Sequence, residues 1–295
     1  VSVSQLPNAG VDGDITLCAI DAVLALYGEL GGSPDATGTW TAPGGSAHSG
    51  TFDPAFDPAG TYTYTVTGAA PCPSDASIVT VAVETPPNAG SNGALSLCSS
   101  SAVEDLFAAL NGTPDAGGTW SAPGGGSSDG SLDPSIAQAG SYVYTVNGTT
   151  PCPSATAQID VTITAAVDAG SDGAILLCSA SPAIDLFAYL NGTPDPSGTW
   201  TAPGGGAVTS AFDPATGTPG TYVYTVVGTA PCPNASAAVL VNVTSNPDAG
   251  LPGDVTLCVS DAPFPFLDLL GGAPDDGGAW VSPGGVAHTG TFDRS

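Results

Sequence analysis

The chain has 295 residues, of which 27 are acidic and one is basic, so its formal net charge at pH 7 is −26. Nucleic-acid binding is excluded because neutralising phosphates requires Lys or Arg, and an anionic membrane surface is disfavoured for the same reason. The sequence begins without a signal peptide, and it has no apolar run near the roughly 18 residues of a membrane-spanning helix.

The sequence is a tandem repeat with a period of 80 residues and no insertion or deletion. A fixed period of this kind is typical of repeat architectures. The recurring residues are Trp40, Trp120, Trp200 and Trp280, together with Cys18, Cys98, Cys178 and Cys258 in one series and Cys72, Cys152 and Cys232 in another. We therefore expect residues 1–6 to be the last strand of a preceding repeat, residues 7–86, 87–166 and 167–246 to be complete repeats, and residues 247–295 to be a truncated one. Both ends of the sequence then lie inside repeats.

The first elements of repeat 1 differ in period. Ile15 and Leu17 alternate with polar neighbours, which predicts a half-buried strand. The segment from Asp21 to Leu30 instead has apolar residues at helical spacing, namely Val23, Leu26, Tyr27 and Leu30. This spacing predicts two or three helical turns that cover one edge of the domain and end at Gly31-Gly32.

The rest of the repeat reads as short strands between Gly- and Pro-rich turns, which predicts an antiparallel β-sandwich. Thr39–Thr41 carries the tryptophan, the strand from Thr61 to Val66 places its tyrosines on one face, and Val79, Val81 and Val83 face inward from the last strand. A tryptophan between threonines could also stack on a sugar, but a core position is more common. The expected core aromatics are Trp40, Trp120, Trp200, Trp280, Tyr62, Tyr64, Tyr142, Tyr144, Tyr222 and Tyr224.

Two cysteines per repeat predict a disulfide and an oxidising compartment. We expect pairing within each repeat, because each repeat could then fold independently. The expected pairs are Cys18 with Cys72, Cys98 with Cys152, and Cys178 with Cys232, while the partner of Cys258 lies beyond Ser295. Pairing across the linker, such as Cys72 with Cys98, leaves the same odd cysteine and stays open.

Alternation along the first strand predicts where the bridge lies. Since Leu17 points inward, Cys18 should leave the strand towards the edge, and Cys72 follows the tyrosine strand in a Pro-Cys-Pro turn. The bridge would then clamp the helical segment to the tip of the last hairpin. A zinc site is disfavoured by the absence of Cys-x-x-Cys spacings and by only two histidines.

No catalytic constellation recurs from repeat to repeat. His48 and His288 occupy one repeat position, at which the middle repeats have Ser128 and Val208. Oxidised cysteines cannot act as nucleophiles. We therefore expect no enzymatic activity, no catalytic residues and no cofactor.

Calcium is the one metal for which the sequence offers ligands, through the carboxylates of Asp12 and Asp14. The equivalents of Asp12 are Asn92, Asp172 and Pro252, and those of Asp14 are Ala94, Ala174 and Asp254, so no ligand set persists. An Asp-Gly or Asn-Gly turn is the favoured interpretation, with calcium left open. Two aspartates recur at the same positions in every repeat, and Asx turns explain both. These are Asp35, Asp115, Asp195 and Asp275, and Asp53, Asp133, Asp213 and Asp293.

Several short motifs recur together: Asn/Asp-Ala-Gly, Leu-Cys, Gly-x-Trp, Gly-Thr-Tyr-x-Tyr-Thr-Val and Pro-Cys-Pro. This combination resembles Ig-like repeats in giant surface proteins of Bacteroidota, among them gliding adhesins and fibrous appendages secreted by the type IX system. The resemblance covers essentially the whole chain. It implies an extracellular, cell-surface fibre or adhesin stalk used for attachment, gliding or prey capture.

Linkers such as Thr85-Pro86-Pro87 are stiffened by proline, which predicts a semi-rigid spacer. We expect a stalk that holds a distal tip away from the cell, with neighbouring repeats as its partners. Copies of the stalk could bundle into a homo-oligomeric filament, and host, prey or surface ligands would be met by other parts of the protein. The alternative is that each repeat itself binds a glycan, a divalent cation or a surface. Arg294 stands where other repeats have proline, so we expect Arg294-Ser295 to come from cloning.

Overall fold

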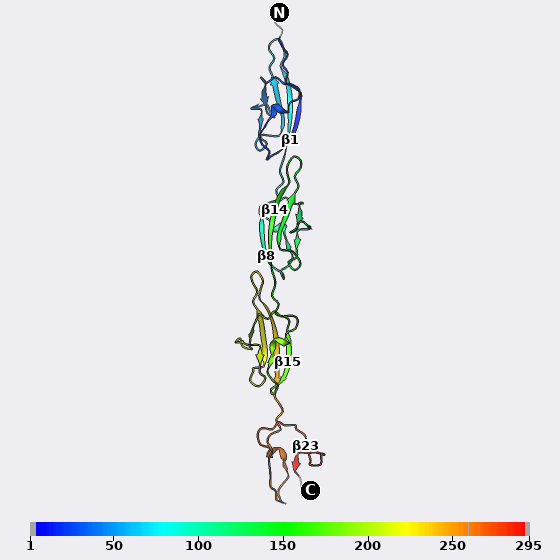
Figure 1. Ribbon diagram of the computed structural model, residues 1–295, viewed down its shortest axis with the longest axis vertical. Coiled ribbons are helices and arrows are strands. Elements are labelled where there is room, and N and C mark those ends of the chain that lie inside the picture. The colour runs from blue at the N-terminus through cyan, green and yellow to red at the C-terminus, as the bar shows by residue number, and fades with distance from the viewer. Residues whose placement is uncertain (1–3, 259, 293–295) are drawn as a thin grey trace. The chain divides into compact units, whose positions relative to one another are not determined.

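The computed structural model describes residues 4–258 and 260–292, and these form strands, short 3-10 helices and loops (Figure 1). By its contacts the chain divides into two compact units. The first runs to Ala166 and also holds Thr229–Cys232, and the second holds Val167–Gly228 and the chain from Pro233 onwards. Within the described residues, none of the helices has the length and apolar character needed to cross a bilayer.

Repeat 1 contains β1 (Gly13–Cys18), β2 (Leu24–Ala25), η1 (Leu26–Glu29), β3 (Thr39–Thr41), β4 (Ala47–His48), β5 (Thr51–Phe52), β6 (Gly60–Val66) and β7 (Asp75–Glu84). Repeat 2 contains β8 (Gly93–Cys98), β9 (Glu104–Asp105), η2 (Phe107–Ala109), β10 (Thr119–Ser121), β11 (Ser127–Ser128), β12 (Ser131–Leu132), β13 (Gly140–Val146) and β14 (Ala155–Thr164). Repeat 3 contains β15 (Gly173–Cys178), β16 (Ile184–Asp185), η3 (Leu186–Tyr189), β17 (Thr199–Thr201), β18 (Ala207–Val208), β19 (Ala211–Phe212), β20 (Gly220–Val226) and β21 (Ala235–Thr244).

Each of these repeats forms a five-stranded and a two-stranded sheet. In repeat 1 the larger sheet has the order β1-β7-β6-β3-β4 and the smaller one pairs β2 with β5. Repeats 2 and 3 have the same order, with β8 and β15 at the edge that β1 occupies in repeat 1. The tandem all-β sandwich expected from the sequence is confirmed.

One pairing departs from the expected antiparallel arrangement, because β1 runs parallel to β7. Their register places Gly13 opposite Val79 and Cys18 opposite Glu84. The same parallel pairing joins β8 to β14 and β15 to β21. The cysteine that closes the first strand of a repeat therefore lies at the end of the repeat where the last strand leaves it.

The core of each sandwich is built from the predicted aromatic residues. In repeat 1, Trp40 is 7% exposed, Tyr62 0% and Tyr64 2%. Phe52 of β5 packs edge-on against Tyr62, with ring centroids 5.4 Å apart, and so joins the two sheets. Burial of such side chains is the main source of stability for a small sandwich.

A hydrogen bond at the start of β6 identifies the sandwich as Ig-like. The Tyr62 hydroxyl donates to the carbonyl of Pro58 at 2.8 Å. Tyr142 and Tyr222 make the equivalent bonds to Gln138 and Thr218. A tyrosine near the start of this strand that bonds a few residues back is the tyrosine corner of Ig-like domains.

The helical segment is shorter than predicted. It consists of the two extended residues of β2 and the single 3-10 turn η1. Leu26 and Leu30 are buried as expected, but Val23 is 60% exposed. The prediction of two or three helical turns is therefore wrong, although the segment does pack against the sheet.

Repeat 4 is described only in part. It contains β22 (Phe264–Pro265), η4 (Phe266–Leu269), β23 (Trp280–Val281), β24 (Ala287–His288) and β25 (Thr291–Phe292). Trp280 is half-buried here. The expectations for Asp293 and Arg294-Ser295 lie outside the described residues, as does half of the strand expected at residues 1–6, and Ser4–Leu6 form no strand.

Candidate functional site

Both disulfides join one repeat to the next. Cys18 at the end of β1 pairs with Cys152 in the turn before β14, and Cys98 at the end of β8 pairs with Cys232 in the turn before β21. Each pair is separated by 134 residues. The predicted pairings of Cys18 with Cys72, Cys98 with Cys152 and Cys178 with Cys232 are wrong, and so is the alternative of Cys72 with Cys98.

The parallel pairing of β1 and β7 explains this result. Cys18 lies opposite Glu84, at the end of β7, whereas Cys72 precedes Asp75, where the ten-residue strand begins. A strand of this length spans about 30 Å, but a disulfide requires Cα atoms within about 7 Å. The two cysteines of a repeat are thus at opposite ends of their domain. Cys18 is 0% exposed, so the expected clamp at the sandwich edge is also wrong.

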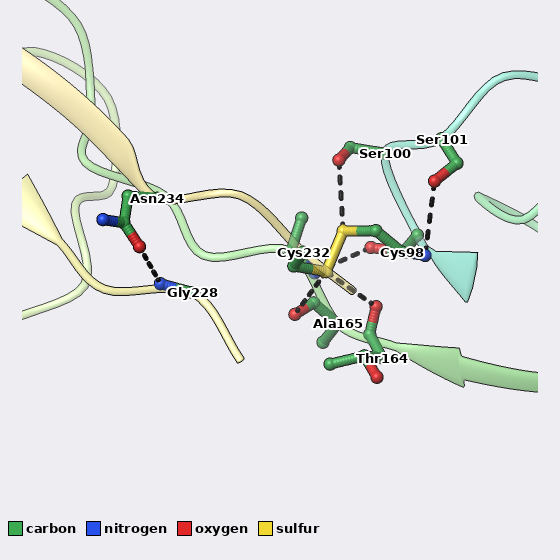
Figure 2. Close-up of a disulfide and its surroundings, with 10 residues drawn as sticks. Cys98, Ser100, Ser101, Thr164, Ala165, Gly228, Cys232 and Asn234 are labelled. Carbon is green, nitrogen blue, oxygen red and sulfur yellow. Dashed lines mark hydrogen bonds between the residues drawn. A yellow bond between two sulfur atoms is a disulfide. The ribbon is translucent and has the colours of Figure 1, made fainter. Parts of the chain in front are cut away.

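The two cystines have matching surroundings. Figure 2 shows Cys232 Sγ beside the main chain that leaves β14, 3.3 Å from the carbonyl oxygen of Thr164. Cys152 Sγ lies 3.4 Å from the carbonyl oxygen of Glu84, at the end of β7. Each hairpin turn thus rests on the last strand of the previous repeat, beside the cysteine to which it is bonded.

The serine-rich turn after β8 contacts Cys98 of the second cystine through two serine hydroxyls. Ser101 Oγ accepts a hydrogen bond from the Cys98 amide at 3.3 Å, and Ser100 Oγ lies 3.2 Å from Cys98 Sγ (Figure 2). In repeat 1 the carboxylate of Asp21 accepts the corresponding bond from the Cys18 amide at 2.7 Å. The conformation of the cysteine is therefore fixed by a side chain three residues later.

The remaining described cysteines, Cys72, Cys178 and Cys258, are thiols in this structure. A partner 134 residues away would fall before residue 1 for Cys72 and after residue 295 for the other two. Cys72 nonetheless has the surroundings of the bonded hairpin cysteines. Its Sγ lies 3.9 Å from the carbonyl oxygen of Ser4, the residue that occupies the position of Glu84 one repeat earlier.

The second tyrosine of each repeat holds a loop to the sheet. Tyr64 Oη donates to the carbonyl of Asp35 at 2.6 Å and accepts from the Gly38 amide at 2.8 Å. The Trp40 ring lies against the Tyr64 ring, with centroids 5.0 Å apart. Trp120 and Trp200 are equally buried. These tryptophans are core residues, and burial leaves them no face on which a sugar could stack.

Of the two calcium candidates, Asp12 has a structural contact and Asp14 is exposed. Asp12 Oδ1 accepts a hydrogen bond from the Ile78 amide at 2.9 Å, which ties the start of the repeat to β7. Asn92 and Asp172 make the same contact in the next two repeats. Asp14 is exposed on β1. Within the described residues, no three His, Cys, Asp or Glu side chains gather where a metal ion could be held.

The recurring aspartates also have structural contacts. Asp35 Oδ2 accepts a bond from the Asn8 amide at 2.9 Å, and the Asn8 carbonyl accepts one from the Asp35 amide. Asp53 Oδ1 accepts from the Ala55 amide at 3.0 Å, which is the expected Asx turn. In Asp133 the amide and hydroxyl of Ser135 both donate to the carboxylate, which lowers its pKa.

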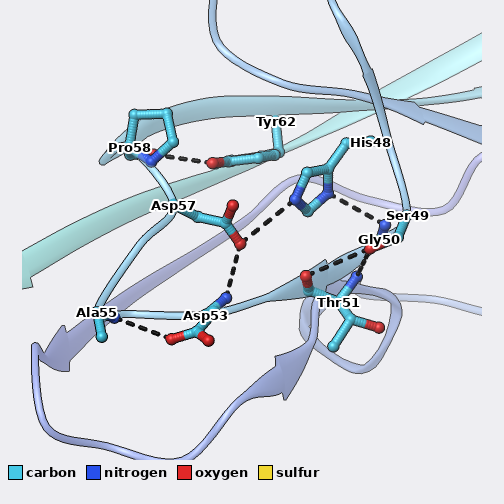
Figure 3. A network of polar contacts seen from close by, with 9 residues as sticks. All are labelled: His48, Ser49, Gly50, Thr51, Asp53, Ala55, Asp57, Pro58 and Tyr62. Atoms are coloured by element: carbon cyan, nitrogen blue, oxygen red, sulfur yellow. Dashed lines mark hydrogen bonds and ion pairs between the residues drawn. The ribbon is translucent and has the colours of Figure 1, made fainter.

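His48 belongs to a small polar network beside the tyrosine corner (Figure 3). Its Nδ1 accepts from the Gly50 amide at 3.0 Å and its Nε2 lies 3.5 Å from Asp57 Oδ2. Burial, and then the nearby Asp57 charge, raise the pKa of Tyr62. In repeat 2, Ser128 Oγ accepts the equivalent hydrogen bond from the Gly130 amide. A hydroxyl therefore replaces the imidazole as the acceptor in this turn.

No protein-family model matches the sequence, and no curated protein does either. Among solved structures, a titin I-band fragment of domains I67–I69 has 11% identity and a TM-score of 0.42, covering 82% of this chain and 100% of its own. Extracellular domains 3–5 of Drosophila OTK have 13% identity and a TM-score of 0.31, covering 83% and 98%. The four N-terminal Ig domains of Dscam1 isoform 4.4 have 13% identity and a TM-score of 0.25, covering 82% and 75%. The titin and Dscam1 structures consist of tandem Ig domains, but the Ig-like assignment of this chain rests on its own strand order and tyrosine corner.

Proposed function

We propose that the chain is a segment of the shaft of an extracellular adhesin or filamentous surface appendage, and that it spaces a distal tip from the cell. The observation that carries this proposal is the pair of cystines that join successive repeats, Cys18 with Cys152 and Cys98 with Cys232. A cross-link between domains adds nothing to a binding site within one domain. It does prevent neighbouring domains from separating, which is what a spacer requires.

The variation between repeats supports the same function. Candidate ligand positions change from one repeat to the next, as at His48, Ser128 and Val208, while the core and the cysteines do not. Disulfides fit an oxidising, extracellular location. The charge of −26 is spread over the array and favours a soluble surface that repels its own copies.

The finer assignment follows from the sequence motifs. Their resemblance to repeats of giant Bacteroidota surface proteins favours a type IX-secreted appendage used in attachment, gliding or prey capture. The repeats of this shaft would be residues 7–86, 87–166 and 167–246. Lateral bundling into a homo-oligomeric filament would require cations or another chain to offset the repulsion between acidic surfaces.

Immunogold electron microscopy of the producing cells tests the location of the segment. An antibody raised against the folded chain should label surface fibres along their length. Labelling confined to fibre tips would contradict the shaft function and favour an adhesive module.

Binding measurements with the full chain separate the two functions directly. The oxidised, fluorescently labelled protein should bind no glycan on a glycan array above the signal of spots that carry no glycan. Specific, saturable binding that survives physiological salt would overturn the spacer function, because a shaft needs no ligand on each repeat.

A further inference from the structure

We propose that the cystines divide the array into two interleaved covalent rails that carry tension, and that the body of each sandwich lies outside both rails. The body of a repeat is here the chain between its strand-end cysteine and its hairpin cysteine, such as residues 19–71. The proposal deepens the shaft function, which supplies the tension, but the connectivity on which it rests is independent of that function.

The first rail can be followed from the start of repeat 1. β1 ends at Cys18, the disulfide continues to Cys152, and the chain then runs through β14 and the linker into β15, which ends at Cys178. The second rail begins with β7 and continues through β8 to Cys98, crosses to Cys232 and enters β21. Each rail therefore uses the last strand of one repeat and the first strand of the next, and then crosses a disulfide to the last strand of the repeat after that.

The two rails are paired with each other inside every complete repeat. β1 lies parallel to β7, β8 to β14, and β15 to β21, each over six residue pairs. Of each pair, one strand belongs to the first rail and the other to the second. Tension that passes from one rail to the other loads the whole ladder of hydrogen bonds along the strand axis, so these bonds resist together rather than one at a time.

Little extra length is stored in a rail. Between Cys152 and Cys178 the chain consists mainly of the ten-residue β14 and the six-residue β15, which are already extended. The slack lies in the bodies, each of about 54 residues, which would release roughly 190 Å if pulled out. While both cystines are intact, tension along either rail does not pass through the bodies. The body of repeat 2, between Cys98 and Cys152, is loaded only when a pull passes from the first rail to the second and the strand ladders between them have ruptured.

Single-molecule force spectroscopy on the full oxidised chain, held at its two ends, tests this connectivity. With both cystines the shortest covalent route between the ends runs from Cys18 to Cys152, returns through the body of repeat 2 to Cys98 and continues from Cys232. It has about 134 residues and should reach about 470 Å once the strand ladders have ruptured. A reductant should lengthen the unfolded chain by about 560 Å.

The signature of interleaved rails is that the two cystines are not additive. The double variant Cys18→Ser/Cys152→Ser should gain only about 90 Å, because the other cystine still bridges the chain, and Cys98→Ser/Cys232→Ser should gain the same. Removing all four cysteines should give the full gain of about 560 Å.

Cys72→Ser is the matched control, since it removes a cysteine that is in neither cystine. It should leave the extended length unchanged. A gain of about 190 Å for Cys72→Ser, or of about 380 Å for each double variant, is what pairing within repeats would give, and either would overturn the proposal. Reduction of the wild-type chain does not discriminate, because three cystines within repeats would also hide about 560 Å. Disulfide mapping of the wild-type chain is the second measurement, so a variant that folds poorly does not decide the outcome. Specific glycan binding would contradict the shaft function without changing these lengths.

Discussion

The two tyrosines on β6 contribute to the fold in different ways. Tyr62 closes the tyrosine corner through its bond to Pro58. Tyr64 ties a loop to the sheet at two points, because its hydroxyl bonds both Asp35 and Gly38. Position 38 requires glycine, because a Cβ there would lie 2.4 Å from the Tyr64 ring.

Tyr64→Phe should destabilise repeat 1 by about 1–3 kcal/mol, because the Asp35 carbonyl and the Gly38 amide both lose their partner. Urea denaturation followed by tryptophan fluorescence measures the change, since Trp40 packs on this ring. Tyr27→Phe is the control, because it removes only one hydrogen bond, from the Tyr27 hydroxyl to the Pro34 carbonyl, and Tyr27 is 37% exposed, so its loss should matter less. Equal effects of the two substitutions would contradict the bridging function of Tyr64.

Alkaline pH should weaken the fold through the corner tyrosines. The pKa values of Tyr62 and Tyr222 are raised above 10.0 by burial. A raised folded-state pKa means that their contribution is complete below pH 10 and is lost as pH rises through the folded-state value. The melting temperature should therefore fall above pH 10, and less steeply in Tyr62→Phe/Tyr222→Phe. A variant with an unchanged alkaline slope would contradict this assignment.

At the scale of elements, one side-chain contact between the start of a repeat and its last strand recurs in repeats 1 to 3. Asp12, Asn92 and Asp172 each accept a bond from an amide of β7, β14 or β21. Carboxylate and side-chain amide oxygens can both accept this hydrogen bond, which accounts for the exchange of Asp and Asn at this position.

Asp12→Asn should therefore leave stability within about 0.5 kcal/mol, whereas Asp12→Ala should cost about 1 kcal/mol or more by leaving the Ile78 amide without its acceptor. Thermal unfolding of both variants decides the point. If calcium were bound through this carboxylate, Asp12→Asn would also be destabilised.

Addition of a chelator should leave the melting temperature unchanged, because Asp12 is engaged with the main chain. The comparison is a melt with and without EDTA at fixed ionic strength. A fall of several degrees that calcium restores would establish a calcium site.

The sequence predicted the strands and the core because alternation and the 80-residue period report burial directly. The helix predicted for residues 21–30 is wrong, although the buried residues Leu26 and Leu30 are four positions apart, as they would be in a helix. The signal against a helix was present in repeat 4, where Pro265 stands in the middle of the equivalent segment and would break an α-helix.

The disulfide pattern could not be predicted from cysteine spacing. Every complete repeat has both cysteines, so pairing within a repeat and pairing with the next repeat use the same two positions. What decides between them is the parallel register of β1 with β7, and parallel and antiparallel neighbours produce the same alternation in sequence.

For the whole molecule, the cross-links add covalent connections between successive repeats to the short linkers. Each cystine closes a loop of 134 residues, for which the chain-entropy model gives about 5 kcal/mol. A small domain gains from such a link because its own core is limited. The interleaved pattern thus combines stabilisation of each repeat with continuity between repeats.

Mass-spectrometric mapping of the disulfides in the unreduced protein tests this pattern most directly. Pepsin at acid pH is suitable, since the chain has a single basic residue and acid suppresses thiolate exchange. Peptides containing Cys18 should be joined to peptides containing Cys152, and those of Cys98 to those of Cys232. Recovery of Cys18 joined to Cys72, or of Cys98 joined to Cys152, would contradict the inter-repeat cross-links and the spacer built on them.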